Sequence, residues 1–325
     1  MKLLVTGGAG YIGSVVTAQL LEAGHEVVVL DNLSKGYRNQ VPAGAELVVA
    51  DLLDAERVGQ VVARGFDGVL HFAALIVVPE SVAEPERYFR TIVGGTLNLL
   101  DAMRAAEIPR LVFSSTAAVY GDPVSVPITE DAPTRPVNPY GAAKLAVDYL
   151  IGAVARAHNL AAASLRYFNV AGASGHLGER HEPETHLIPL VLRVAAGHDD
   201  AARVFGTDYP TRDGTAIRDY VHVEDLAHAH LLALGAVRPG EHRIYNVGSG
   251  TGFSVHEVIE AARRVTGHAI PTVASPRRAG DPPALVASSE KLRAELGWAP
   301  KKPDLATMIE DAWRWMRVHD ATIQV

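Results

Sequence analysis

The chain has 325 residues, of which 48% are hydrophobic and 21% are charged, a composition typical of a globular protein with room for two domains. It contains no cysteine, which excludes disulfides, thiolate catalysis and cysteine-ligated zinc, and its formal net charge of −7 disfavours a nucleic-acid partner. Glycines at positions 7, 8 and 10 break a signal-peptide core, and no run of about 18 apolar residues occurs, so we expect a soluble, cytoplasmic protein without a membrane span.

The first half of the chain alternates short apolar runs with amphipathic segments. The runs are rich in Val, Leu and Phe without strict alternation, as expected for strands that are buried on both faces. We predict strands at residues 2–6, 26–30, 46–50, 68–73, 110–115 and 161–167, with helices between them at residues 14–24 and 91–107. This order predicts an α/β fold with a doubly wound, parallel Rossmann-type sheet in a domain of residues 1–168.

The texture of the sequence changes after residue 168. Residues 169–186 are polar and loop-like, and helical patterns follow at residues 186–197 and 222–237. We predict that residues 169–325 form mainly a smaller, interleaved α+β domain. A segment near residues 220–247 is expected to return to the first domain.

The stretch "TGGAGYIG" follows the first predicted strand and opens the first predicted helix. Gly8, Gly10 and Gly13 fit the pattern G-x-G-x-x-G, and Gly7, Gly10 and Gly13 fit G-x-x-G-x-x-G. Glycines at these positions let the turn close and let a pyrophosphate approach the amides at a helix N-terminus. The context of strand, turn and helix therefore predicts a dinucleotide site.

Two acids follow later strands of the same predicted sheet. Asp31 ends the second strand, 24 residues after Gly7, where a ribose-binding acid belongs. Its carboxylate would repel a 2′-phosphate, which favours NAD over NADP. Asp51 follows the third strand, where it is placed either to reach the adenine or to cap a helix.

The stretch "NPYGAAK" places Tyr140 four residues ahead of Lys144, so that on a helix the two side chains share one face. A free tyrosine has a pKa of about 10 and is a poor base at neutral pH. The Lys144 ammonium and the positive ring of oxidised nicotinamide would both favour the phenolate. Thr116, at the end of the strand in "FSSTAAVYG", is placed to hydrogen-bond a substrate hydroxyl or simply to satisfy backbone groups.

The motifs "VTGGAGYIGS", "DNLS", "HFAA", "FSSTAAVYG", "NPYGAAK", "RYFNVAGA", "VFGTDYPTRDGTAIRDYVHVEDLA", "YNVGSGTGFSV" and "PRRAGDPPALVA" follow one another along the chain. In content and order they resemble the extended short-chain dehydrogenase/reductases, and within them the nucleotide-sugar 4-epimerases. The resemblance covers nearly the whole chain. It implies an isomerase that holds NAD tightly, acts on a UDP-hexose, interconverts UDP-glucose and UDP-galactose through a 4-keto intermediate, and forms a homodimer.

The resemblance also implies three sets of site residues. The catalytic set is Thr116, Tyr140 and Lys144. The cofactor set is Gly7, Gly10, Tyr11, Ile12, Gly13, Asp31, Asn32, Asp51, Leu52, Phe72, Ala73, Ala74, Ser114, Tyr140, Lys144 and Tyr167. The substrate set is Thr116, Tyr140, Asn169, His186, Leu187, Arg218, Arg278, Asp281 and Leu285. Arg218 and Arg278 suit a diphosphate because the planar guanidinium donates two hydrogen bonds at once.

The chain departs from these relatives at a few binding positions. Ile76 and Val77 stand where a lysine is common, Ile92 where an asparagine is common, and His186 replaces another asparagine. These changes put the tightness of NAD retention and the sugar preference in question. Leu285 occupies a position that resembles a gate against 2-acetamido sugars, and its intermediate size predicts weak activity on them.

Three other functions compete with 4-epimerisation of UDP-glucose. The Tyr-x-x-x-Lys pair also occurs in relatives that act on N-acetylhexosamines or uronates and in nucleotide-sugar dehydratases and decarboxylases. The dehydratases and decarboxylases need an acidic residue just after the threonine, where this chain has Ala117 and Ala118. An NAD-sensing binding protein would not need the Thr116–Tyr140–Lys144 set. A zinc enzyme would use the three histidines of the polar loop, His176, His181 and His186, but their spacing fits no standard zinc motif, and we expect solvated loop histidines and no metal.

Overall fold

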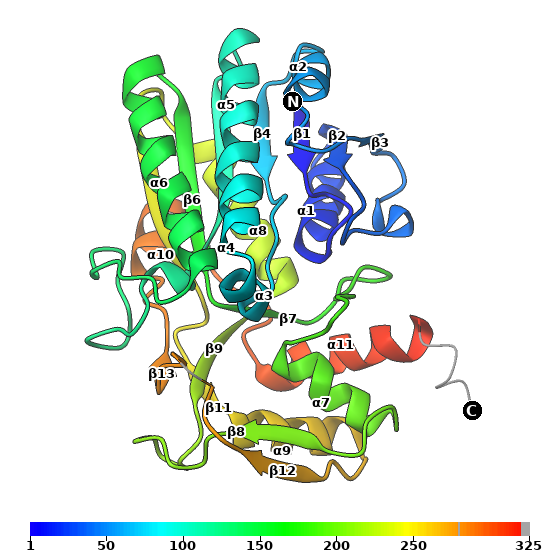
Figure 1. Ribbon diagram of the computed structural model, residues 1–325. Helices are drawn as coiled ribbons and strands as arrows, with labels where there is room; N and C mark the ends of the chain where they lie inside the picture. Colours follow the sequence, from blue (N-terminus) through cyan, green and yellow to red (C-terminus); the bar gives the residue numbers. More distant parts are fainter. Residues whose placement is uncertain (279, 320–325) are drawn as a thin grey trace.

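The computed structural model describes residues 1–278 and 280–319, and seven parallel strands form its main sheet (Figure 1). The strand order is β10-β6-β5-β4-β1-β2-β3, which confirms the predicted doubly wound α/β fold. The strands are β1 (Lys2–Thr6), β2 (Glu26–Asp31), β3 (Glu46–Val49), β4 (Gly68–His71), β5 (Arg110–Thr116), β6 (Ala161–Tyr167) and β10 (His242–Val247).

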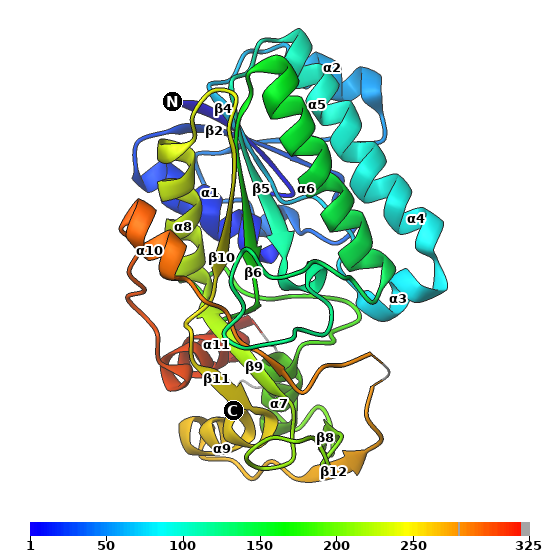
Figure 2. The ribbon, with the colours of Figure 1, turned by 90° about the vertical axis from the view of Figure 1, so that its left-hand side faces the viewer.

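Helices cover both faces of this sheet (Figures 1 and 2). One face packs against α2 (Ala55–Val62), α5 (Gly95–Ala105) and α6 (Pro139–His158), and the other against α1 (Tyr11–Glu22) and α8 (Val223–Ala236). Successive β1 residues Leu3 and Leu4 belong to opposite apolar cores, and both are fully buried. Burial on both faces explains why the strands lack a period-two pattern.

Short elements complete this part of the molecule. They are η1 (Arg38–Gln40), α3 (Val78–Ala83), α4 (Pro85–Phe89), the π-helical η2 (Arg90–Gly94), η3 (Ala117–Val119) and α10 (Glu290–Leu296). The predicted helix at 14–24 begins three residues earlier, at Tyr11, because Gly10 is its N-cap. The predicted helix at 91–107 is divided between η2 and α5.

The carboxyl ends of the main strands face a second region built around β9 (Figure 1). Its strands are β7 (Asn169–Ala171), β9 (Ile217–His222), β11 (Gly252–Ser254) and β13 (Ala284–Leu285) in one sheet, and β8 (Ala202–Phe205) with β12 (Thr272–Ser275) in a second. Its helices are α7 (Leu187–Ala195), α9 (Val255–Thr266) and α11 (Leu305–His319), which share one apolar core.

The chain crosses between the two regions more than once. After β9, α8 packs against α1 and β10 joins the edge of the main sheet beside β6. We therefore retain, as a proposal, a first domain of residues 1–168 with a returning segment near 220–247. Among the described residues, no helix is both long enough and apolar enough to span a bilayer.

Candidate active site

The glycine loop between β1 and α1 has the close backbone packing that a dinucleotide site needs. Gly7 has a φ of +74°, and a Cβ on it would lie 2.5 Å from the backbone nitrogen of Ala73. A Cβ on Gly13 would lie 2.3 Å from the Gly7 carbonyl oxygen. Gly10 has no side chain with which to cap α1, so the N–H groups of Tyr11 and Ile12 in the first turn are available to a phosphate.

Asp31 lies at the end of β2, next to this loop, and is buried. One carboxylate oxygen accepts a hydrogen bond from the Ala9 N–H at 3.0 Å, and the other accepts from the Leu33 N–H at 2.8 Å. Burial raises the pKa of Asp31, and the two backbone donors oppose that rise. Each oxygen has a second lone pair, so the carboxylate is able to accept ribose hydroxyls while it holds the glycine loop.

Asp51 does not cap a helix, so that alternative was wrong. Its carboxylate accepts from the Asn32 side-chain amide and from the Leu53 N–H, both at 2.8 Å. The N-cap of α2 is Asp54, which accepts from the Arg57 N–H at 3.0 Å. Asp51 and Asn32 therefore form one polar pair at the ends of β2 and β3, and contact with adenine stays a prediction.

Four further predicted cofactor residues follow strands of the main sheet. Phe72, Ala73 and Ala74 follow β4 directly, and the Phe72 N–H donates to the Thr6 carbonyl at 2.9 Å. Leu52 is buried, and its carbonyl accepts from the Asn98 side chain at 2.8 Å.

Ile76, Val77 and Ile92, which depart from the relatives near the cofactor, differ in their surroundings. Ile76 and Val77 are partly exposed at the start of α3. Ile92, in η2, is buried in the apolar core between the sheet and α5. Their effect on cofactor retention stays a prediction.

Thr116, Tyr140 and Lys144 meet where β5 ends and α6 begins. Thr116 is the last residue of β5 and lies near enough to the Tyr140 hydroxyl to lower its pKa, while the Thr116 hydroxyl oxygen accepts from the Ala118 N–H at 3.1 Å. Asn138 caps α6 by accepting from the Gly141 N–H at 2.8 Å, which fixes the first turn that carries Tyr140. The structure thus brings the three predicted catalytic residues together.

Ser114 and Tyr167 form hydrogen bonds next to the catalytic residues. The Lys144 ammonium nitrogen donates to the Ser114 carbonyl at 2.8 Å, and the Ser114 hydroxyl hydrogen-bonds the Tyr167 hydroxyl. Lys144 is only 2% exposed, and its nitrogen lies 4.7 Å from the centre of the Phe113 ring. Its position on α6 is therefore fixed by contacts with β5.

The expected acidification of Tyr140 by Lys144 is not the dominant effect. Burial raises the pKa of Tyr140 to about 12, and the nearby Thr116 hydroxyl opposes the rise only in part. Burial also lowers the pKa of Lys144 to about 7. Desolvation dominates the pKa of each group, so the protein alone does not prepare a phenolate. The positive charge of the oxidised nicotinamide ring, which the sequence analysis also invoked, would lower the pKa of Tyr140 and so oppose the effect of burial.

Sequence reasoning missed a buried network behind Lys144. Asp148, one helical turn further along α6, pairs with Arg166 at 3.0 Å, and its charge raises the pKa of Lys144. Ser115 donates to the same carboxylate at 3.1 Å, and Arg166 donates to the Tyr120 hydroxyl, also at 3.1 Å. The spacing of Asp148 four residues after Lys144 is the signal that would have indicated it.

The predicted substrate residues of the second region gather around β9. Asn169 in β7 pairs with Tyr220 in β9, and Arg218 in β9 forms an ion pair with Asp281. Leu285 in β13 pairs in register with Arg218, and it packs against the apolar cluster that contains Ala117. Because Ala117 directly follows Thr116, this packing brings Arg218 and Leu285 toward the catalytic group.

Sequence reasoning also missed Asp219, which organises this edge. Its carboxylate accepts from the backbone N–H groups of Ser249, Gly250 and Ala287 at 2.8 to 3.0 Å and from the Ser249 hydroxyl at 2.7 Å. Asp219 in β9 therefore connects β9 by hydrogen bonds to Ser249 and Gly250, which follow β10, and to Ala287, which follows β13. Arg278, by contrast, is exposed, and its guanidinium lies 4.1 Å from the centre of the Phe205 ring.

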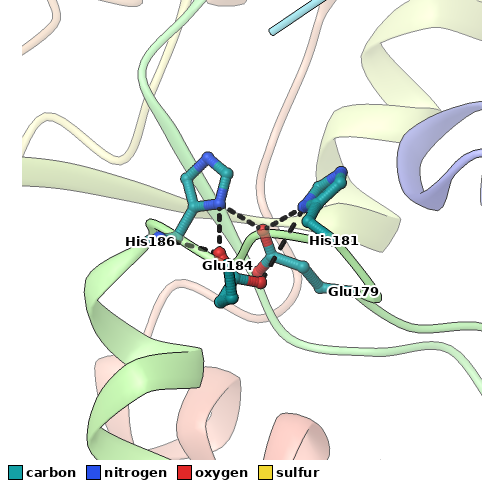
Figure 3. A group of neighbouring side chains, drawn as sticks. All are labelled: Glu179, His181, Glu184 and His186. Carbon is teal, nitrogen blue, oxygen red and sulfur yellow. Dashed lines mark hydrogen bonds and ion pairs between the residues drawn. The ribbon is translucent and has the colours of Figure 1, made fainter. Parts of the chain in front are cut away.

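The expectation that the loop histidines are solvated holds for His176 and is wrong for the other two. His181 and His186 are partly buried, and both form ion pairs with Glu179 and Glu184 (Figure 3). His186 is the N-cap residue of α7, directly before Leu187. Its side chain points into this acidic group, because the loop folds back on itself, and its contact with substrate stays a prediction.

The glycine loop with its acid, the Tyr-Lys pair and the strand-end threonine define a dinucleotide-dependent enzyme of the extended short-chain dehydrogenase/reductase class. Residues 3–248 match the model of the NAD dependent epimerase/dehydratase family, and the chain belongs to that family.

Several proteins similar to this chain are named UDP-glucose 4-epimerase. A UDP-glucose 4-epimerase of Corynebacterium glutamicum is 59% identical over 96% of this chain and 95% of its own length. One from Streptomyces lividans is 59% identical over 98% of this chain and 97% of its own length. The crystal structure of a UDP-glucose-4-epimerase from Stenotrophomonas maltophila, with bound NAD and formylated UDP-arabinopyranose, has a TM-score of 0.93 and 40% identity and covers 98% of each chain.

Proposed function

We propose that this chain interconverts UDP-glucose and UDP-galactose by NAD-dependent inversion at C4 of the sugar. The observation that carries the proposal is the meeting of Thr116, Tyr140 and Lys144 where β5 ends and α6 begins, in the same sheet that carries the glycine loop. Full-length relatives at 59% identity that are named for this reaction support it.

The residues fit NAD, because Gly7 and Gly13 leave no room for side chains and Asp31 presents a carboxylate beside the loop. The α1 N-terminus would hold the pyrophosphate and Asp31 the adenosine ribose. Bound NAD supplies the acceptor for the C4 hydride and, once reduced, its donor, so the reaction needs no external redox partner.

The chain's own residues move the proton and hold the sugar. Tyr140 removes the proton of the sugar 4-hydroxyl, and Thr116 orients that hydroxyl. Arg218 holds the diphosphate while the 4-keto sugar turns about its phosphate link and presents its other face. Tyr140 then returns the proton to the C4 oxygen, so that both the proton and the hydride of the starting sugar are restored.

The test is incubation of the purified protein with UDP-galactose, without added reductant, followed by NMR of the products. The expected product is UDP-glucose. A 4-keto-6-deoxy sugar or a pentose would move the protein to the dehydratase or decarboxylase class. Ala117 and Ala118, which begin η3 directly after Thr116, offer no acid for those reactions. Tight NAD binding without any turnover would support the sensor function instead.

We also propose that the protein works in the cytoplasm as a homodimer. The absence of cysteine suits a reducing compartment. Helices α3, α4, α5 and α6 lie on the same side of the main sheet and carry exposed apolar side chains, among them Val82, Phe89, Leu97 and Tyr149. A second copy of the chain would bury such a surface.

A further inference from the structure

Four side chains of the loop between β7 and α7 converge on one point: Glu179, His181, Glu184 and His186 (Figure 3). One ligand atom from each, an imidazole nitrogen or a carboxylate oxygen, lies within 4.8 Å of the other three. The group lies outside the catalytic triad, and neither the fold nor the proposed reaction explains it.

The spacing of these atoms is close to that of the ligands of a four-coordinate metal. Glu179 Oε1 lies 3.1 Å from His181 Nδ1 and 2.8 Å from His186 Nδ1. Glu184 places Oε1 2.8 Å from His186 Nδ1 and Oε2 3.9 Å from His181 Nδ1. Ligands about 2.0–2.2 Å from Zn²⁺ in a tetrahedron lie roughly 3.3–3.6 Å from one another, so three of these separations would have to lengthen by a few tenths of an ångström and the fourth to shorten on binding.

Hydrogen bonds between the four side chains do not fully account for their short distances. His186 Nδ1 is 2.8 Å from an oxygen of Glu179 and 2.8 Å from an oxygen of Glu184, yet it carries at most one proton. The same Glu184 oxygen already accepts from the Thr185 and His186 N–H groups at 2.6 and 2.7 Å. A cation at the centre would use a lone pair from each group, and the two backbone donors would orient the Glu184 carboxylate as second-shell partners do.

The two carboxylates of the group need positive charge, which a bound cation would supply in place of protonated imidazoles. The Glu179 and Glu184 side chains are only 9% and 11% exposed, and the ion pairs found for them in the described part of the chain are with His181 and His186. The nearby Arg180 instead lies over the Tyr37 ring, 4.1 Å from its centre. Two carboxylates so close together and so little hydrated need positive charge between them.

We propose that Glu179, His181, Glu184 and His186 bind a divalent transition metal of the Zn²⁺ type through two imidazole nitrogens and two carboxylate oxygens. Mixed imidazole and carboxylate ligands near tetrahedral spacing suit Zn²⁺ and disfavour Mg²⁺ or Ca²⁺, which prefer all-oxygen sites. With four protein ligands, the site is closed and structural, so it takes no part in the C4 chemistry.

The metal would fix the loop that joins the two halves of the molecule. The loop is anchored on one side by the Tyr11 hydroxyl, which donates to the Gly172 carbonyl at 2.6 Å. On the other side Gly178 packs on the Trp315 ring, and His186 leads directly into α7 and Leu187. A cation at the centre would therefore set the start of α7 relative to the glycine loop.

The test begins with the whole protein treated with a chelator, dialysed and titrated with ZnCl₂. We expect one Zn²⁺ per chain by calorimetry and by elemental analysis, and a higher Tm after loading. The Co²⁺-loaded protein should show the strong visible absorption of tetrahedral Co²⁺, a readout that depends on no variant. Wild-type protein that takes up no zinc, or whose Co²⁺ spectrum is that of an octahedral ion, would overturn the proposal in favour of proton-bridged ion pairs.

Variants then assign the ligands. H181A and E184Q should each weaken zinc binding by at least about 10–100-fold, because a lost ligand costs no less than a lost second-shell partner. In E184Q the remaining amide oxygen still accepts the two backbone N–H groups, so the loop keeps its local support. The matched control is H176A, an exposed histidine of the same loop, which should bind zinc as the wild type does. Equal losses in all three variants would refute the assignment.

Discussion

The protein groups around Tyr140 fix the position of its hydroxyl but do not lower its pKa below the ordinary value. The hydroxyl lies near Thr116, and burial raises its pKa to about 12. A tyrosine with such a pKa acts as a base at neutral pH only if a nearby positive charge lowers that pKa. The nicotinamide ring of bound NAD would supply this charge, whereas the protein supplies the position of the hydroxyl.

Tyr140→Phe removes the hydroxyl and keeps the ring, so turnover of UDP-galactose should fall by roughly 10²–10⁴-fold while nucleotide-sugar binding changes little. The measurements are kcat and the dissociation constant of UDP. Tyr149→Phe, on the exposed side of the same helix, is the matched control and should leave kcat unchanged. Near-normal turnover of the Tyr140 variant would remove it from the mechanism.

Leu285 decides sugar preference if it lines the pocket as we expect. It lies beside Arg218 and against the cluster that follows Thr116. Leu285→Tyr should lower kcat/KM for UDP-N-acetylgalactosamine relative to UDP-galactose, and Leu285→Ser should raise it, each by roughly 10–100-fold because a few apolar contacts are worth about 1–3 kcal/mol. The ratio of the two kcat/KM values is the measurement. A ratio that is equal in all three proteins would place Leu285 outside the pocket.

At the scale of the element, α6 carries three working residues at successive turns: Tyr140, Lys144 and Asp148. Asp148 raises the pKa of Lys144, whereas burial lowers it to about 7. Lys144 is therefore close to losing its charge near neutral pH. The helix keeps that charge by placing a carboxylate one turn further along.

Asp148→Asn should lower the pKa of Lys144 further, because the carboxylate that favours the ammonium is gone. The cationic form would then be lost at lower pH, so the alkaline limb of the kcat–pH profile should move toward acid, with turnover at pH 8 reduced several-fold and partly recovered at pH 6. Asp101→Asn, an exposed aspartate of α5, should leave the profile in place. An unmoved alkaline limb in Asp148→Asn would show that Lys144 does not titrate there.

Most strands of the main sheet could be predicted from the sequence, whereas the first residues of α1 and α2 could not. Six of the seven strands of the main sheet were predictable, because continuous Val and Leu runs such as residues 26–30 are buried on both faces. The seventh strand, β10, was not predicted as a strand, and its residues were expected only to lie in a segment near 220–247 that returns to the first domain. The start of α1 was misplaced because its N-cap is a glycine, which gives no capping signal. Asp54 and Asp51 stand three residues apart, and local spacing does not say which one caps α2.

The candidate site divides in the same way. Thr116, Tyr140 and Lys144 are carried by local motifs at the ends of regular elements, so their meeting was predictable. The group of Glu179, His181, Glu184 and His186 was not, because it depends on how an irregular loop folds back on itself. Asp219 was missed for a related reason: its partners lie about 30 and 68 residues away along the chain.

At the scale of the whole molecule, the proposed active site draws on both regions. The glycine loop and α6 belong to the main sheet, whereas Arg218 and Leu285 belong to the second region. Contacts between the two, such as the Tyr11 hydroxyl on the Gly172 carbonyl, fix the distance between cofactor and sugar. A second copy of the chain that packs against α5 and α6 would contact helices that cover the main sheet (Figure 1).

The homodimer prediction follows from that surface. Leu97 on α5 and Tyr149 on α6 are 43% and 66% exposed, so we expect the wild type to elute as a dimer of about twice its 34.6 kDa chain mass in size-exclusion chromatography with light scattering. The double variant Leu97→Glu/Tyr149→Glu should shift it to the monomer, since burying two carboxylates at such an interface is costly. Val124→Glu, at a position that is 90% exposed in the loop between η3 and α6, should stay dimeric. A wild type that is monomeric at micromolar concentration, or a double variant that remains dimeric, would exclude α5 and α6 as the interface.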